Sequence, residues 1–164
     1  MTNCFSKKCF YIYTDKQLQD IWDIKMDKYH FSIPVYKNNE LIYYYCRKMV
    51  KKTLSEGRYF FDTLKKDINP FDYYFSYKGI LPKTDILYIY EGILDVICYG
   101  HLEKSISFYK KFDGKIIELL KNYKNIIVYV DNDIHGIEYF NKINKKFKQA
   151  ERRFIDNDRR QNFF

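Results

Sequence analysis

The chain has 164 residues, of which 46% are hydrophobic, so it is long enough to form one cored domain, or one domain with a small annex. Its 29 basic and 21 acidic residues give a net charge of +8, which favours a polyanionic partner because cationic surfaces bind nucleic acid by releasing its counterions. No stretch approaches the roughly 20 apolar residues of a membrane-spanning helix, and the N-terminus lacks an apolar signal-peptide core, so we expect a cytoplasmic protein without a membrane partner.

Residues 1–83 have an irregular pattern and contain all three prolines. The segment DKQLQDIWDIKMDKY has apolar residues at helical spacing as far as Met26, and it predicts a short amphipathic helix over residues 15–29. Two aromatic, β-branched segments follow, FSIPVY and LIYYYCR, and Asn38-Asn39 between them predicts a hairpin turn. We therefore expect residues 1–83 to form a small, basic α+β subdomain.

Residues 84–164 alternate regularly between strand and helix patterns. NIIVYV is apolar at successive positions, as is typical of a strand with both faces covered. The alternation predicts an α/β domain with a parallel four-stranded sheet and flanking helices. The strands are expected at residues 85–90, 105–108, 125–130 and 152–156, and the helices at residues 92–102, 113–123 and 135–149.

Acidic side chains follow three of the four predicted strands. Glu91 ends the first strand, with Asp95 one turn into the next helix, and Asp131 and Asp133 follow NIIVYV. Functional groups of parallel sheets gather at the carboxyl ends of the strands, so these side chains are expected at one edge if the strands are neighbours. The last strand ends in two further carboxylates, Asp156 and Asp158.

Such a density of carboxylates is unfavourable without a cation, because like charges repel and raise each other's pKa. Oxygen ligands suit a hard divalent cation, so the pattern predicts a site for Mg²⁺ or Mn²⁺. Gly92 and Gly136 supply permissive backbone where the chain turns close to this site. An alternative is that each Asp only caps the helix that follows it, which is common for a single Asp at a strand end.

The segments ILYIYEGILDVICYG and IIVYVDNDIHGIEYF resemble the Toprim domain, which primases, topoisomerases and certain nucleases share. The Glu-Gly-x-x-Asp-Val run is most similar to that of DnaG-type and phage primases, and the Asp-x-Asp pattern followed by Gly resembles the second Toprim motif. The resemblance covers about 75 residues. It implies a Toprim-like fold for residues 84–164, and it places Asp156 and Asp158 at the third acidic motif.

The resemblance extends upstream, where HFSIPVYKNNELIYYYCRKM looks like the primase segment of two strands ending in an Arg. It implies that Arg47, Lys48 and Arg58 contact template or nucleotide phosphates, since basic side chains follow a nucleic-acid backbone. The alternative for these residues is solvated surface charge, which the Lys-rich composition would itself produce.

The resemblance implies catalysis by Glu91, Asp95, Asp131 and Asp133. Glu91 would act as general acid or base or as a metal ligand, and Asp131 and Asp133 would hold one or two divalent metals. The expected function is phosphoryl transfer on nucleic acid, as a primase that makes short RNA primers from ribonucleotides on a single-stranded DNA template.

Two other functions are also compatible with the sequence. One is a small Toprim nuclease of the RNA-maturase or DNA-repair type, because the same carboxylates can activate water. The other is a non-catalytic nucleic-acid-binding subunit of a replication complex. Unlike full primases, the sequence shows neither a zinc module nor a helicase, so a partner could supply either one in trans. The small size and the compositional bias suggest a phage origin, and hence the host cytoplasm.

Overall fold

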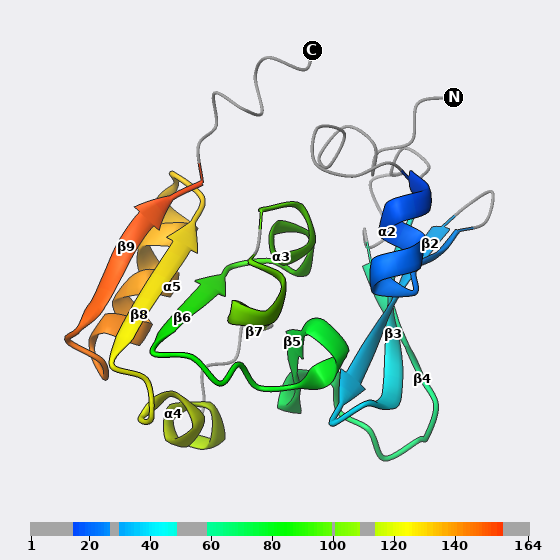
Figure 1. Cartoon of the computed structure of the whole chain (residues 1–164), viewed down its shortest axis with the longest axis horizontal. Helices are drawn as coiled ribbons and strands as arrows, with labels where there is room; N and C mark the ends of the chain where they lie inside the picture. Colours follow the sequence, from blue (N-terminus) through cyan, green and yellow to red (C-terminus); the bar gives the residue numbers. More distant parts are fainter. Residues whose placement is uncertain (1–14, 27–29, 49–58, 100, 109–113, 156–164) are drawn as a thin grey trace, which may run out of the picture. The chain divides into compact units, whose positions relative to one another are not determined.

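The computed structural model describes residues 15–26, 30–48, 59–99, 101–108 and 114–155 (Figure 1). The chain divides into two compact units, of which the first comprises Met1–Pro70 and Lys78–Ile80. The second comprises Phe71–Tyr77 and Leu81–Phe164, so it includes a short segment upstream of residue 84, where the second domain was expected to begin. No helix in the described ranges is long and apolar enough to span a membrane.

The first described element of the first unit is helix α2 (Asp15–Trp22), which is shorter than expected. Asp23 adopts a left-handed backbone with φ of 54°, a conformation that stops a right-handed helix. The chain then enters strand β1 (Lys25–Met26), so the prediction that the helix continues as far as Met26 is wrong. The apolar spacing identified the buried Trp22 correctly but carried no signal for the break at Asp23.

The sheet of the first unit has the order β1-β2-β3-β4 and is antiparallel throughout. The predicted hairpin is confirmed, since β2 (His30–Lys37) and β3 (Glu40–Lys48) are joined by Asn38 and Asn39. Both asparagines have positive φ, 50° and 67°, as a two-residue hairpin turn of the primed type requires. Strand β4 (Tyr59–Thr63) completes the sheet.

The second unit is built on a five-stranded sheet with the order β5-β7-β6-β8-β9 (Figure 1). The four predicted strands are present and mutually parallel. An additional strand, β5, pairs antiparallel with β7 at the edge of the sheet. Its three residues are too few to give a periodic signal in the sequence. The strands are β5 (Tyr74–Ser76), β6 (Ile86–Tyr90), β7 (Ser105–Phe108), β8 (Asn125–Val130) and β9 (Ala150–Phe154).

Helices α3 (Ile93–Tyr99), α4 (Gly114–Leu120) and α5 (Ile134–Asn144) connect these strands. The core lies between α4, α5 and the sheet face that carries Ile89 and Val128, both fully buried. Tyr90 points to the opposite face, where its ring stacks on Tyr129 at 4.8 Å. This is the predicted α/β fold, a largely parallel sheet with flanking helices. Single 3-10 turns lie at Pro70–Asp72, Tyr77–Gly79 and Leu102–Lys104.

Candidate functional site

The strand order fixes where a site can form in the second unit. From β6 the chain passes through α3 to β7 on one side, and then crosses to β8 on the other side of β6. The connections therefore diverge between β6 and β8, and a parallel sheet opens a crevice at that point beyond the carboxyl ends of its strands. Glu91 directly follows β6 and Asp131 directly follows β8, so both lie at this opening.

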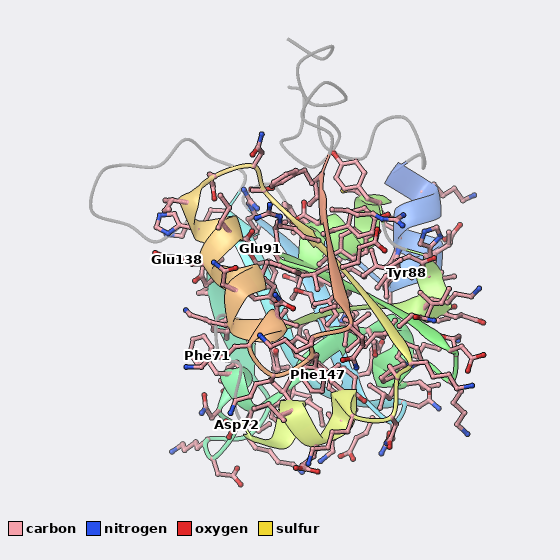
Figure 2. All side chains as sticks on the ribbon, turned by 90° about the vertical axis from the view of Figure 1, so that its left-hand side faces the viewer. Phe71, Asp72, Tyr88, Glu91, Glu138 and Phe147 are labelled. Carbon is pink, nitrogen blue, oxygen red and sulfur yellow. The ribbon has the colours of Figure 1, made fainter. Side chains whose placement is uncertain are left out.

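Glu91 is held by the ends of three neighbouring strands. Its backbone N–H donates to the carbonyl oxygen of Tyr129 at 3.2 Å, and its own carbonyl oxygen accepts from the Ser107 hydroxyl at 3.4 Å. Its carboxylate accepts a hydrogen bond from the backbone N–H of Asp131 at 3.3 Å. Figure 2 labels Glu91 at the end of the unit where α5 begins. The first and second motifs are thus joined by a direct contact.

The surroundings of Glu91 disfavour its charged form. Partial burial is the main cause that raises its pKa, and the negative charges of Asp131, Asp133 and Asp95 raise it further. The hydrogen bond from the Asp131 N–H opposes the shift. The four carboxylates predicted from the two motifs are therefore close enough to interact electrostatically through Glu91.

Asp133 both caps a helix and faces the site edge. It is the N-cap of α5, and its carboxylate oxygen Oδ1 accepts from the Gly136 N–H at 2.8 Å. The helix-cap interpretation therefore holds for this Asp, yet its side chain is exposed and has free oxygen lone pairs. A capping carboxylate of this kind can also bind a cation.

The two motif glycines are needed for steric reasons, and to different degrees. A Cβ on Gly136 would lie 2.2 Å from the backbone oxygen of Asp131, so only glycine lets the first turn of α5 approach the end of β8 this closely. A Cβ on Gly92 would lie 2.8 Å from the carboxylate Oδ2 of Asp95, which is buried at 6% exposure in α3. Gly92 therefore makes room for a carboxylate rather than for backbone.

The oxygen ligands at this edge are compatible with magnesium. Among the described residues, no group of three or more His, Cys, Asp or Glu side chains gathers about a single point that could hold a metal. Mg²⁺ does not require such a cage, because it keeps several waters and binds through one or two carboxylates together with substrate phosphates. Three of the five predicted ligands are described residues: Asp131 and Asp133 could provide those carboxylates, and the Glu91 carboxylate lies beside them, bonded to the Asp131 N–H. The other two predicted ligands, Asp156 and Asp158, lie outside the described residues.

The predicted phosphate-binding residues belong to the first unit. Arg47 and Lys48 end β3 and are half-buried, whereas Arg58 lies outside the described residues. Adjacent strand residues point to opposite faces, so Arg47 and Lys48 cannot follow one backbone on the same face of the sheet. Arg47 is paired in register with Tyr59, whose ring stacks on Tyr45 at 5.5 Å. Arg47 therefore lies beside the exposed ring of Tyr59, whereas Lys48 pairs with His30, whose ring contacts the exposed Phe60 on the other face.

Sequence reasoning missed two side chains near Glu91. One is Ser107, whose hydroxyl donates to the backbone of Glu91. The other is Tyr139 of α5, whose hydroxyl oxygen is buried. Burial raises the pKa of Tyr139, and the nearby charge of Glu91 adds to the shift. Nothing distinguishes Tyr139 from the other tyrosines in a chain with 18 of them, so only the fold could identify it.

Residues 88–161 match the family described as Toprim-like. No curated protein matches the chain. Among solved structures, the zinc-binding and RNA polymerase domains of the Aquifex aeolicus primase match at a TM-score of 0.60 and 12% identity, covering 86% of this chain and 40% of that chain.

Two other solved structures match similarly. The RNA polymerase domain of the Mycobacterium tuberculosis primase DnaG has a TM-score of 0.60 and 14% identity, and covers 88% of this chain and 55% of its own. A DnaG primase catalytic domain bound to single-stranded DNA has a TM-score of 0.56 and 15% identity, and covers 85% of this chain and 50% of its own. The chain thus spans about half, or less, of the length of each of these proteins.

The residues that match the Toprim-like family include both acidic motifs. They also include strands β7 and β8 and most of β6, whose order in the sheet brings the two motifs together. The similarity to the primase structures covers 86–88% of the chain, so it extends into the first unit. Residues 88–161 therefore match the Toprim-like family, and the fold of the chain is similar to that of part of the primase catalytic cores.

Proposed function

We propose that the protein is a primase-type nucleotidyltransferase that makes short RNA primers on single-stranded DNA by metal-dependent phosphoryl transfer. The observation that carries the proposal is the convergence of Glu91, Asp131 and Asp133 at the adjacent carboxyl ends of β6 and β8. The solved structures with a similar fold are primases, and one of them is bound to single-stranded DNA. That similarity supports the choice of substrate.

In this proposal Asp131 and Asp133 bind the divalent metal, Mg²⁺ or Mn²⁺, and Asp95 completes the negative field. The metal would neutralise phosphoryl oxygens and lower the pKa of the attacking hydroxyl. Glu91 acts as general acid or base, because its raised pKa brings a carboxylate closer to the range in which it exchanges protons near neutral pH. Its hydrogen bond from the Asp131 N–H fixes the carboxylate relative to the metal-binding loop.

The remaining partners follow from the same proposal. Single-stranded DNA would be the template and ribonucleotides the substrates, with Arg47, Lys48 and Arg58 contacting phosphates. A helicase or a zinc-module subunit would act in trans. The place of action would be the cytoplasm, or the host cytoplasm if the gene is carried by a phage. Asp156 and Asp158 would add ligands to the metal site.

One assay with two readouts tests the proposal. The protein is incubated with Mg²⁺ or Mn²⁺, single-stranded template and labelled ribonucleotides, and in parallel with labelled DNA and RNA. The expected result is short new oligonucleotides that require both the metal and the template, and that disappear in the Asp131→Asn, Asp133→Asn double variant. Far-ultraviolet circular dichroism of the double variant controls for folding.

The other outcomes reassign the function. Cut DNA or RNA without synthesis would contradict the primase proposal and identify a Toprim nuclease that uses water as the nucleophile. Tight DNA binding with neither product would identify a non-catalytic subunit of a replication complex. Unchanged turnover in the double variant would show that Asp131 and Asp133 are not part of the catalytic site.

A further inference from the structure

The second unit carries a basic surface that none of the predicted binding residues includes. It is formed by the last turn of α5, the connecting residues 145–149 and the strand that follows, β9, which is the edge strand opposite β5. In both figures α5 and β9 lie side by side (Figures 1 and 2). We define the α5–β9 basic surface as six exposed side chains: Lys142, Lys145, Lys146, Lys148, Arg152 and Phe154.

The charges of this surface are not neutralised within the described part of the protein. Its four lysines form no ion pair with any described carboxylate, whereas Lys121 and Lys124 of the same unit pair with Glu118 and Asp85. Lys142 stands three residues before Lys145 and four before Lys146, spacings at which like charges repel on a helix or its end. An anionic ligand would relieve this repulsion.

The helix dipole accounts for only part of the pattern. Cations are favourable in the last turn of a helix, and Lys142 occupies that position in α5. Lys148 and Arg152 lie beyond the helix, where the dipole has little effect. The basic surface therefore extends further than helix stability requires.

Aromatic rings beside these cations add a second kind of contact. The Arg152 guanidinium lies over the rings of Phe140 and Phe154, at 5.5 and 4.8 Å from their centroids. Phe154 is 42% exposed, so its ring is accessible to a ligand. An exposed ring next to phosphate-binding cations is the combination that binds single-stranded nucleic acid, because unpaired bases stack on the ring while cations contact the backbone.

We propose that the α5–β9 basic surface is a second binding site for single-stranded nucleic acid, separate from Arg47 and Lys48. Its lysines and Arg152 contact phosphates, and Phe154 stacks on an unpaired base. The surface lies in the same unit as the carboxylates, at the opposite end of α5 from Asp133. A strand bound here would be retained by the catalytic domain itself. The inference rests on the proposed function for its choice of nucleic acid, but not on catalysis.

The proposal can be tested by binding alone, without turnover. Fluorescence anisotropy measures the affinity of the protein for a labelled oligothymidylate in EDTA at a series of salt concentrations. The variant Lys145→Ala, Lys146→Ala, Lys148→Ala is compared with the control Lys104→Ala, Lys121→Ala, Lys124→Ala, which removes the same charge from exposed sites in the same unit. We expect the first variant alone to lower the salt slope by about 2, since each single-strand phosphate contact contributes roughly 0.7.

A second variant tests the stacking contact. Phe154→Leu keeps an apolar side chain at the end of β9 but removes the ring, and it should weaken single-strand binding roughly tenfold while leaving duplex binding unchanged. Equal slopes for the two triple variants would overturn the phosphate contacts, because net charge would then explain the binding. Equal loss of single-strand and duplex binding in Phe154→Leu would overturn the stacking.

The result also stands apart from the proposed catalytic function. If the primer assay fails while the triple variants differ as expected, the binding site stands and the primase proposal falls. If synthesis occurs and the two triple variants bind alike, the primase proposal stands and this surface is not a binding site.

Discussion

Glu91 is the residue whose environment has the clearest consequence for stability. Its pKa is raised above 4.5 in the folded protein, first by burial and then by the neighbouring aspartates. An acid with a raised folded pKa favours the folded state at low pH, and this contribution is lost as the pH rises through the folded pKa. At neutral pH without metal, the ionised Glu91 therefore destabilises the protein.

We predict that Glu91→Gln raises the melting temperature in EDTA at about pH 7 by a few degrees, because the neutral amide removes the repulsion. The Gln carbonyl oxygen can still accept from the Asp131 N–H, so the contact between the motifs is kept. At about pH 4, where Glu91 is protonated in the folded state, the two proteins should melt alike. Calorimetry at both pH values measures the difference. A lower melting temperature for the variant at neutral pH would contradict the conclusion that the pKa of Glu91 is raised in the folded protein.

The two motif glycines provide a matched pair of substitutions. We predict that Gly136→Ala destabilises the protein by about 1–3 kcal/mol, because the new Cβ meets the Asp131 backbone, which cannot move without shifting β8 or α5. Gly92→Ala should lower the free energy of unfolding by clearly less, because the Asp95 carboxylate can rotate away from the new Cβ. Urea denaturation compares the two variants. Equal losses would show that the backbone approach at Gly136 is not what requires glycine there.

At the scale of the element, α5 begins at a residue with two roles. Asp133 caps the helix through its bond from the Gly136 N–H, and in our account it also binds metal. Asn caps helices about as well as Asp, but it lacks the charge that a metal ligand needs. The two roles can therefore be separated by substitution.

We predict that Asp133→Ala lowers the unfolding free energy by about 1 kcal/mol through loss of the cap, whereas Asp133→Asn leaves it nearly unchanged. Both variants should lose metal-dependent activity. Chemical denaturation in EDTA gives the stabilities, and the primer assay gives the activities. Full activity in the Asp133→Asn variant would show that Asp133 caps the helix but does not bind the metal.

The elements also show how much the sequence could predict. The parallel strands were predictable because short apolar runs alternate with helical patterns, and two of these runs, ILYIYEG and NIIVYVDND, end abruptly in acidic residues. Strand β5 and the early end of α2 were not, since three residues carry no periodicity and a left-handed Asp23 leaves no mark on apolar spacing. Both misses are local conformations that tertiary contacts decide.

At the scale of the whole molecule, the candidate site follows from strand order. The sequence predicted Glu91, Asp131 and Asp133 at strand ends, but only the order β7-β6-β8 places Glu91 and Asp131 beside each other. Sequence could not find Tyr139 or the Asp131 N–H bond to Glu91, because both depend on how α5 and β8 pack. The residue types in the sequence indicate which chemistry is possible, whereas the contacts between side chains that are distant in sequence are known only from the fold.

The central claim is that this sheet edge binds a divalent metal. Titration of Mn²⁺ followed by electron paramagnetic resonance measures binding directly, without substrate. We predict that the wild-type protein binds Mn²⁺, that Mg²⁺ competes for the site, and that Asp131→Asn with Asp133→Asn removes the binding while the fold is kept. The matched control is Asp62→Asn with Asp85→Asn, which removes the same charge elsewhere. Equal Mn²⁺ binding by the wild type and the Asp131, Asp133 variant would contradict the account.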